Sequence, residues 1–261
     1  MKKIIFFMVF NSFIFSMPAG NPSFPSLIKK GFFISQATWF NFRVGYEGNF
    51  VRDRLFLQND QSKKKVDDFK KYSNSVKGVF NILKRLDIYG TWGENKIEAN
   101  WIIEEMQDVY SFLEIESKYS NCWSCGGKAI FFEWGNTTLS LGGGYSYTNP
   151  KILYLIKNGE VDKLDSFNIN VHEWQVDMGI SYKIDMFVPY VLAKYSKAKA
   201  KLAIDNCIIG SNFSSELYMK SKNNFGMALG CSLSSSKYFL LNAEVRLIDE
   251  EAVTINGEFR F

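Results

Sequence analysis

The chain has 261 residues and a formal net charge of +4 at pH 7, with 31 Lys and Arg against 27 Asp and Glu. So small and so dispersed an excess of positive charge argues against a nucleic-acid-binding protein. The 24 Phe, 13 Tyr, 6 Trp and 19 Gly instead favour a membrane β-barrel. Barrels place aromatic side chains at the membrane interfaces and glycine where backbones approach closely.

The N-terminus has the layout of a secretory signal peptide. Lys2 and Lys3 precede an apolar run over residues 4–15, and small residues follow at Ser16 and Ala19. We predict cleavage after Ser16, with Ala19 as the second choice. Loss of the two lysines then lowers the formal charge from +4 to +2. A buried helix of a soluble protein is disfavoured, because three prolines follow at once.

Export would divide the chain into a signal peptide, residues 1–16, and a mature domain, residues 17–261. The mature part has no apolar stretch long enough for a membrane-spanning helix. An exported protein of this kind is either soluble or a barrel, since only helices and closed barrels satisfy their backbone hydrogen bonds inside a bilayer.

Six segments alternate apolar and polar residues with a period of two. In the last strand Val253, Ile255 and Phe259 share one face, and Thr254 and Glu258 share the other. A barrel strand turns alternate side chains to lipid and to the lumen, so this pattern is the one expected. The segments are 40–47, 138–147, 173–183, 224–233, 239–247 and 252–261.

A soluble β-sandwich would also alternate, but its polar faces would carry many charged residues. Here the polar faces of the central strands are rich in Gly, Ser, Thr and Asn. The chain also ends on an amphipathic strand with Phe259 and Phe261, which we interpret as the signal read by the barrel-assembly machinery. The sequence therefore predicts an all-β fold, a transmembrane antiparallel β-barrel in contact with the lipid bilayer.

Strand parity predicts the topology, with both termini periplasmic, short periplasmic turns and longer outer loops. The segment 96–118 allows two counts: as a hairpin it gives about twelve strands, and as one loop about ten. We predict about twelve strands and keep ten as the alternative. The expected turns are 83–85, 134–136, 185–188 and 234–237, and the expected outer loops are 53–72, 149–170, 203–214 and 249–251.

One strand breaks the pattern. Val191, Ala193 and Tyr195 have the lipid-facing parity, but the lysines at 197, 199 and 201 then occupy the same parity. A lysine facing lipid costs about 2–4 kcal/mol at the midplane and little near the interface. Either the strand leaves the membrane at about Tyr195 or a bulge reverses its phase, and the first explanation is the simpler.

Six stretches of the sequence resemble the chlamydial major outer membrane protein family of porins. The resemblance is strongest in His172–Lys194 and Ala243–Phe261. This chain is shorter than the usual members, chiefly in the outer loops, so it resembles a short member or a paralogue. The six stretches are Met17–Leu27, Arg43–Leu55, Asn81–Gly93, Gly126–Ile152, His172–Lys194 and Ala243–Phe261.

The resemblance implies a passive porin of the cell outer membrane that is typically a homotrimer. It also implies a surface antigen that strengthens the envelope through disulfide-linked partners. We therefore predict diffusion of ions and small hydrophilic solutes through the lumen. The alternative is a non-conducting surface barrel that acts as an adhesin or antigen through its outer loops.

Ten charged residues have the inward parity, and we predict that they line the pore. Charged walls keep a channel hydrated and bias the passage of ions. In a ten-stranded barrel the same residues could instead pair across a closed lumen. The ten are Arg43, Glu47, Glu173, Asp177, Lys183, Lys194, Glu244, Arg246, Glu258 and Arg260.

We expect no enzyme activity, no cofactor and no metal. His172 is the only histidine, and Glu173 beside it would point to the opposite face of the strand. The four cysteines are not arranged as two closely spaced pairs for zinc.

The four cysteines remain candidates for disulfides, with three pairings open: Cys122, Cys125, Cys207 and Cys231. Cys207, in an outer loop, could reach either Cys122 or Cys125. Cys231 lies on the lipid-facing parity, where we expect it to be free or cross-linked to a partner.

Overall fold

The computed structural model describes residues 17–27, 39–54, 56–58, 66–106, 109–163, 168–203, 216–234 and 238–261. The predicted signal peptide, residues 1–16, lies outside the described residues, and so does Cys207 with most of the predicted outer loop 203–214.

The described chain consists of one short helix and fifteen strands. Within these ranges no helix is long and apolar enough to cross a membrane. The elements are α1 (Phe24–Leu27), β1 (Phe40–Arg54), β2 (Phe56–Gln58), β3 (Val66–Ile82), β4 (Leu86–Met106), β5 (Val109–Ser117), β6 (Ser120–Trp134), β7 (Thr137–Thr148), β8 (Ile152–Lys157), β9 (Glu160–Lys163), β10 (Ile169–Tyr182), β11 (Phe187–Ala203), β12 (Glu216–Ser221), β13 (Phe225–Ser234), β14 (Phe239–Leu247) and β15 (Glu250–Arg260).

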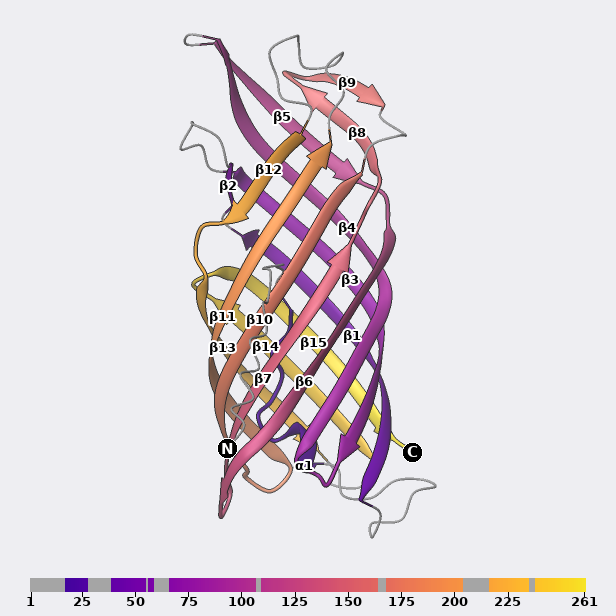
Figure 1. Ribbon diagram of the computed structural model, residues 1–261, viewed down its shortest axis with the longest axis vertical. Helices are drawn as coiled ribbons and strands as arrows, with labels where there is room; N and C mark the ends of the chain where they lie inside the picture. Colours follow the sequence, from indigo (N-terminus) through magenta and orange to yellow (C-terminus); the bar gives the residue numbers. More distant parts are fainter. Residues whose placement is uncertain are drawn as a thin grey trace, which may run out of the picture.

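The strands form one closed antiparallel barrel, as predicted (Figure 1). The last strand closes on the first, with β15 paired to β1 from Arg43↔Arg260 to Arg54↔Glu250. Among the described elements, ten strands make up the closed ring, the smaller of the two counts left open by the sequence. Around the ring they are β1, β3, β4, β6, β7, β10, β11, β13, β14 and β15.

The segment 96–118 shows why the count is ten. It does form a hairpin, in which β4 pairs with β5 from Glu98↔Glu116 to Met106↔Val109. This hairpin lengthens two strands that already cross the barrel, because β5 is followed at once by β6 on the same descending path (Figure 1). The hairpin therefore lengthens the barrel at its outer end and adds no further crossing of the membrane.

Two of the predicted outer loops are wrong in part, because both contain strands. The segment 53–72 includes β2 and the start of β3, and 149–170 includes β8, β9 and the start of β10. These outer extensions pair with one another: β5 with β8, β8 with β9, and β12 with both β11 and β2. The predicted turn at 83–85 is present. The chain also reverses at 135–136 and 185–186, within the predicted turns 134–136 and 185–188.

The alternation read from the sequence is confirmed in the described strands. Along β15 the buried residues are Glu250, Ala252, Thr254, Asn256, Glu258 and Arg260, and the intervening side chains are exposed apart from the half-buried Gly257. The exposed face of the barrel is an apolar surface, as contact with lipid requires.

The interrupted alternation of apolar and polar residues along β11 is not caused by a bulge. β10 and β11 pair without a shift from Ile169↔Leu202 to Ser181↔Tyr190. The lysines at 197, 199 and 201 therefore keep the outward parity, on a strand that continues beyond the lipid-facing part. This is the simpler of the two explanations that the sequence left open.

Candidate functional site: the barrel interior

The barrel interior holds nine of the ten residues predicted to line a pore. Each of the nine is at most 7% exposed. The exception is Lys183, which follows β10 in the periplasmic-side turn and is only half-buried. It has the inward parity, but the strand ends one residue earlier, at Tyr182, so its place in the lumen stays a prediction. The nine are Arg43, Glu47, Glu173, Asp177, Lys194, Glu244, Arg246, Glu258 and Arg260.

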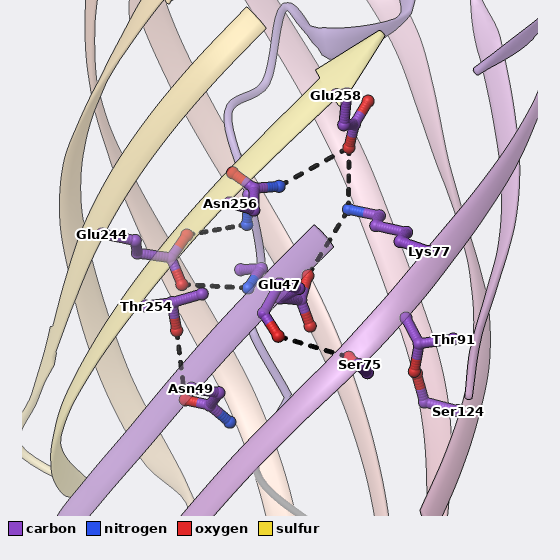
Figure 2. Close-up of polar contacts among 12 residues, drawn as sticks. Glu47, Asn49, Ser75, Lys77, Thr91, Ser124, Glu244, Thr254, Asn256 and Glu258 are labelled. Atoms are coloured by element: carbon purple, nitrogen blue, oxygen red, sulfur yellow. Dashed lines mark hydrogen bonds and ion pairs between the residues drawn. The ribbon is translucent and has the colours of Figure 1, made fainter. Parts of the chain in front are cut away.

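Residues 17–27, here named the lumen segment, lie inside the barrel. The carboxylate of Glu244, on β14, accepts two hydrogen bonds from the backbone of this segment. Oε1 accepts from the Ala19 N–H at 3.0 Å and Oε2 from the Gly20 N–H at 2.7 Å. Tyr190 donates its hydroxyl to the same carboxylate at 2.9 Å. In Figure 2, dashed lines join the Glu244 carboxylate to neighbouring nitrogen atoms. The predicted mature domain is thus a barrel with its first described residues inside it.

Three further wall side chains hold the lumen segment by its carbonyl groups. Lys128 Nζ donates to Gly20 O at 2.8 Å, Asn81 Nδ2 to Pro25 O at 3.1 Å, and Arg43 Nη1 to Phe24 O at 3.3 Å. The side chains of Phe24 and Leu27 pack on Val188 and Leu240 at the periplasmic end. The segment therefore fills the lower lumen through both polar and apolar contacts.

The wall charges around the lumen segment are paired. Arg43 contacts Asp87 at 2.5 Å and Glu258 at 2.9 Å. Lys77 Nζ lies 3.1 Å from Glu258 and 3.6 Å from Glu47, and Figure 2 shows it between the two carboxylates. Buried charges require such partners, because an unpaired charge in a poorly hydrated interior is costly.

A second network lies against the outer turn between β14 and β15. Arg246 contacts Glu250 at 2.6 Å and donates to Asn49 Oδ1 at 2.6 Å. Lys194 lies 2.5 Å from Glu250 and 2.8 Å from Asp249. Among the described residues, seven of the nine buried lumen residues thus form ion pairs with other interior side chains, as expected for the closed alternative that the sequence left open.

Above the charged networks the interior becomes apolar. Seven strands contribute to a buried cluster, here named the apolar roof, in which Leu113 and Leu155 are fully enclosed. Its members are Phe69, Ile97, Ala99, Leu113, Ile115, Ile152, Leu155, Ile169, Val171, Ala198, Ala200, Leu202 and Met219. The outer extensions of the barrel therefore pack on one another through their inward faces.

Two small cavities lie between the lumen segment and the walls. Counted as space open to the centre of a water molecule, one measures about 20 Å³ and is lined by Met17, Glu47 and Lys77 among others. The other measures about 40 Å³ and lies beside Met17, Cys122 and Thr148. Each has room for one to a few waters, so neither is wide enough to pass a hydrated solute.

Lys77, Asp87 and Lys128 belong to the interior network but were missed in the sequence. Lys77 lies on β3, whose two faces both mix polar and apolar residues: Val79 points inward and Asn74 does not. Lys128 lies on β6, whose pairing with β7 shifts between Ile130 and Phe132. The inward phase of Lys128 follows only from the pairing, in which it lies opposite Gly142 of β7.

The described cysteines are all free thiols. Cys122 and Cys125 lie three residues apart on β6 and so point to opposite faces. Cys122 lines the larger cavity, whereas Cys125 is exposed on the outer surface of the barrel. The pairing of either with Cys207 falls outside the described residues.

His172 lies on the outer surface, where its Nδ1 is 3.0 Å from the Tyr145 hydroxyl, and Glu173 is fully enclosed in the interior. The prediction that these two neighbours face opposite sides is confirmed.

An antiparallel barrel with an apolar outer surface and a charged interior is a transmembrane β-barrel of the outer-membrane type. Comparison with known proteins agrees with this assignment to the outer-membrane barrels. A model of the family described as Chlamydia major outer membrane protein matches residues 160–216. The major outer membrane porins of Chlamydia trachomatis serovars L1 and F are each 24% identical to this chain, and the alignments cover 100% of this chain and 99% of each relative.

The chain is therefore similar along its whole length to the chlamydial major outer membrane porins, and it is a multi-pass barrel of the cell outer membrane. The alignment with the serovar L1 porin runs over 390 positions, against 261 residues here. The chain is thus a short relative, as its sequence indicated.

Among solved structures, the chain is similar to the outer membrane protease OmpT of Escherichia coli, with a TM-score of 0.40, 10% identity, and coverage of 85% of this chain and 96% of that one. It is also similar to the outer membrane protein OprG of Pseudomonas aeruginosa, with a TM-score of 0.38, 8% identity, and coverage of 90% and 99%. At these scores the backbones agree only loosely, and neither protein's activity transfers to this chain.

Proposed function

We propose that this protein is an outer-membrane porin for ions and small hydrophilic solutes, and that the structure captures its closed state. The observation that carries the proposal is the relation to chlamydial porins over the full chain. The charged interior supports it, because charged walls suit a hydrated path. The lower lumen is filled by only eleven described residues, the lumen segment.

The lumen segment can leave without breaking the barrel. Among the described pairings, residues 17–27 form no ladder with a wall strand. Wall side chains such as Glu244 and Lys128 hold it by its backbone groups. Water can replace such bonds, so the net cost of releasing each one is only about 0.5–3 kcal/mol.

A second candidate is a non-conducting surface barrel that binds a host or envelope partner through its outer loops. The apolar roof favours this candidate, because it closes the outer end as the lumen segment closes the inner one. Conduction requires both closures to open, so the two functions differ in a measurable way.

Planar-bilayer conductance of four refolded proteins separates the candidates. They are the chain from Met17, the chain from residue 28 without the lumen segment, the Leu155→Ser variant of the roof, and the combination of the last two. We expect discrete conductance steps in all four, brief in the first and longest-lived in the combination. A folding control is the change in gel mobility on heating that intact barrels show.

Four silent proteins that retain their folded mobility would overturn the porin and leave the surface barrel. Equal open times in all four would keep the porin but contradict closure by the lumen segment.

We also propose that the chain catalyses no reaction, since its only histidine lies on the outer surface away from the charged interior. Cleavage after Ser16 is proposed as well, on the signal-peptide layout of residues 1–16. A homotrimeric state and disulfide-linked envelope partners are proposed from the family resemblance. The exposed thiol of Cys125 is a suitable point for such a cross-link.

A further inference from the structure

Four lysines gather on the outward face of the barrel near its outer end. Lys197, Lys199 and Lys201 alternate along β11, and Lys220 of β12 lies directly opposite Lys199. We call these four residues the basic patch. On β10 the residues opposite the three β11 lysines are Trp174, His172 and Asn170. The positions of β10 and β12 that pair with the three β11 lysines thus carry aromatic, neutral or basic side chains.

An aromatic row lies immediately below the patch. Tyr195 of β11 lies between Trp174 of β10, at a centroid distance of 5.4 Å, and Phe225 of β13, at 5.0 Å. Aromatic rows of this kind mark the boundary between hydrocarbon and headgroups. A barrel strand needs about 9–11 residues to cross the membrane. Counted from the start of β11 at Phe187, the crossing ends between Tyr195 and Lys197, which agrees.

The height of the patch follows from strand geometry. With a rise of about 3.3 Å per residue and a tilt of about 40°, Lys197, Lys199 and Lys201 lie about 5, 10 and 15 Å above Tyr195. The headgroup layer is about 5–8 Å thick on each side of the hydrocarbon. Long lysine side chains can bend toward that layer, so their ammonium groups reach the lipid phosphates.

We propose that the basic patch binds the phosphate groups of an outer-leaflet glycolipid, a molecule with acyl chains and a phosphorylated sugar headgroup. The acyl chains would pack on the aromatic row and the apolar wall below it. The phosphates would lie among the ammonium groups, and the sugars would contact Tyr218, which already stacks with Lys201 at 5.4 Å. A basic cluster beside a transmembrane segment is a known form of lipid headgroup recognition. This site is independent of whether the lumen conducts.

Native mass spectrometry of the folded full barrel tests the proposal. The protein is exchanged from detergent containing bisphosphorylated lipid A or, separately, phosphatidylglycerol. The patch variant carries Lys197→Gln, Lys199→Gln and Lys220→Gln. Its matched control removes three positive charges at the periplasmic end, with Lys84→Gln, Arg85→Gln and Lys183→Gln. Gel mobility with and without heating confirms that both variants fold.

We expect retention of lipid A by the parent and the control, and roughly hundredfold weaker retention by the patch variant, since each lysine near a lipid phosphate contributes about a factor of five. Equal retention by the parent and the patch variant would overturn the site. Equal loss in the control would show general charge attraction and overturn it too. Phosphatidylglycerol bound as tightly as lipid A would overturn the assignment to a glycolipid.

Discussion

Glu244 and Gly20 lie 224 positions apart in the sequence, and a 2.7 Å hydrogen bond joins the Glu244 carboxylate to the Gly20 backbone N–H. The same carboxylate also accepts from the Ala19 N–H at 3.0 Å. One wall side chain thus satisfies two successive backbone donors of the lumen segment, and Arg246 lies 3.3 Å away to balance its charge. Hydrogen bonds to a charged acceptor contribute about 1.5–3 kcal/mol each.

The first prediction concerns Glu244→Gln, which keeps the size of the side chain but removes its charge. We expect the lumen segment to leave the lumen about ten to a hundred times more often, because the two charge-assisted hydrogen bonds from Ala19 and Gly20 are weakened. Cys122 lines the cavity beside Met17 and reports the change. The measurement is its rate of modification by a charged thiol reagent, followed by peptide mass spectrometry.

Glu250→Gln is the matched control for this prediction. Glu250 pairs with Arg246 and Lys194 in the same interior, and none of the hydrogen bonds described for it reaches the lumen segment. We expect no increase in Cys122 modification for this variant. An equal increase in both variants would mean that the reagent reports loosening of the barrel and not release of the segment.

The sequence predicted the barrel but not how the lumen segment and the apolar roof close its lumen. Strict alternation, as in β15, predicted the fold and placed nine charged residues inward, because lipid on one side and water on the other impose opposite polarities. The lumen segment has no such period, and its polar groups meet partners such as Glu244 only after the barrel closes. The apolar roof was missed because Ile169 and Val171 are apolar yet point inward, where the alternation rule expects polar groups.

The second prediction concerns the buried pair of Lys128 and Asp177, which lie 3.0 Å apart with side chains 4% and 3% exposed. Lys128→Met leaves a buried carboxylate without its partner, so we expect a loss of about 3–5 kcal/mol in the free energy of unfolding. The double variant with Asp177→Asn should lose less than the single one. Urea unfolding in detergent, followed by tryptophan fluorescence, measures both.

An exposed ion pair of the same type provides the comparison. Lys70 and Asp68 lie 2.8 Å apart with side chains 34% and 38% exposed. Lys70→Met should cost less than about 1 kcal/mol, because solvent screens this pair. A Lys128→Met loss no larger than that of Lys70→Met would show that the interior is hydrated and not tightly packed.

The third prediction concerns the apolar roof. Leu155 of β8 is fully enclosed, so Leu155→Ala removes buried methyl groups and leaves a cavity. We expect a loss of about 2–5 kcal/mol in unfolding free energy. Val161→Ala in the adjacent β9, where the side chain is 59% exposed, should change it by no more than about 0.5 kcal/mol. Similar values for the two variants would mean that the outer extensions do not pack in solution.

The fourth prediction concerns the two cysteines of β6. Because Cys122 and Cys125 point to opposite faces, no disulfide can join them without breaking the strand. Peptide mass spectrometry of oxidised, non-reduced protein should find no link between them. A membrane-soluble maleimide should modify Cys125 faster than Cys122, since Cys125 is exposed on the outer surface. A Cys122–Cys125 link in folded protein would contradict the register of β6.

The fifth prediction concerns the C-terminal aromatic side chain. The Phe261 backbone N–H donates to Phe42 O at 3.0 Å, a bond that does not need the ring. Phe261→Ala should therefore refold in detergent like the parent, whereas its assembly in the outer membrane of a Gram-negative host should fall several-fold. The control is Phe80→Ala, which removes another exposed ring, 39% exposed, from β3 near the same end. Heat-dependent gel mobility of membrane fractions measures assembly. If both variants assemble equally well, the machinery does not read the ring of Phe261.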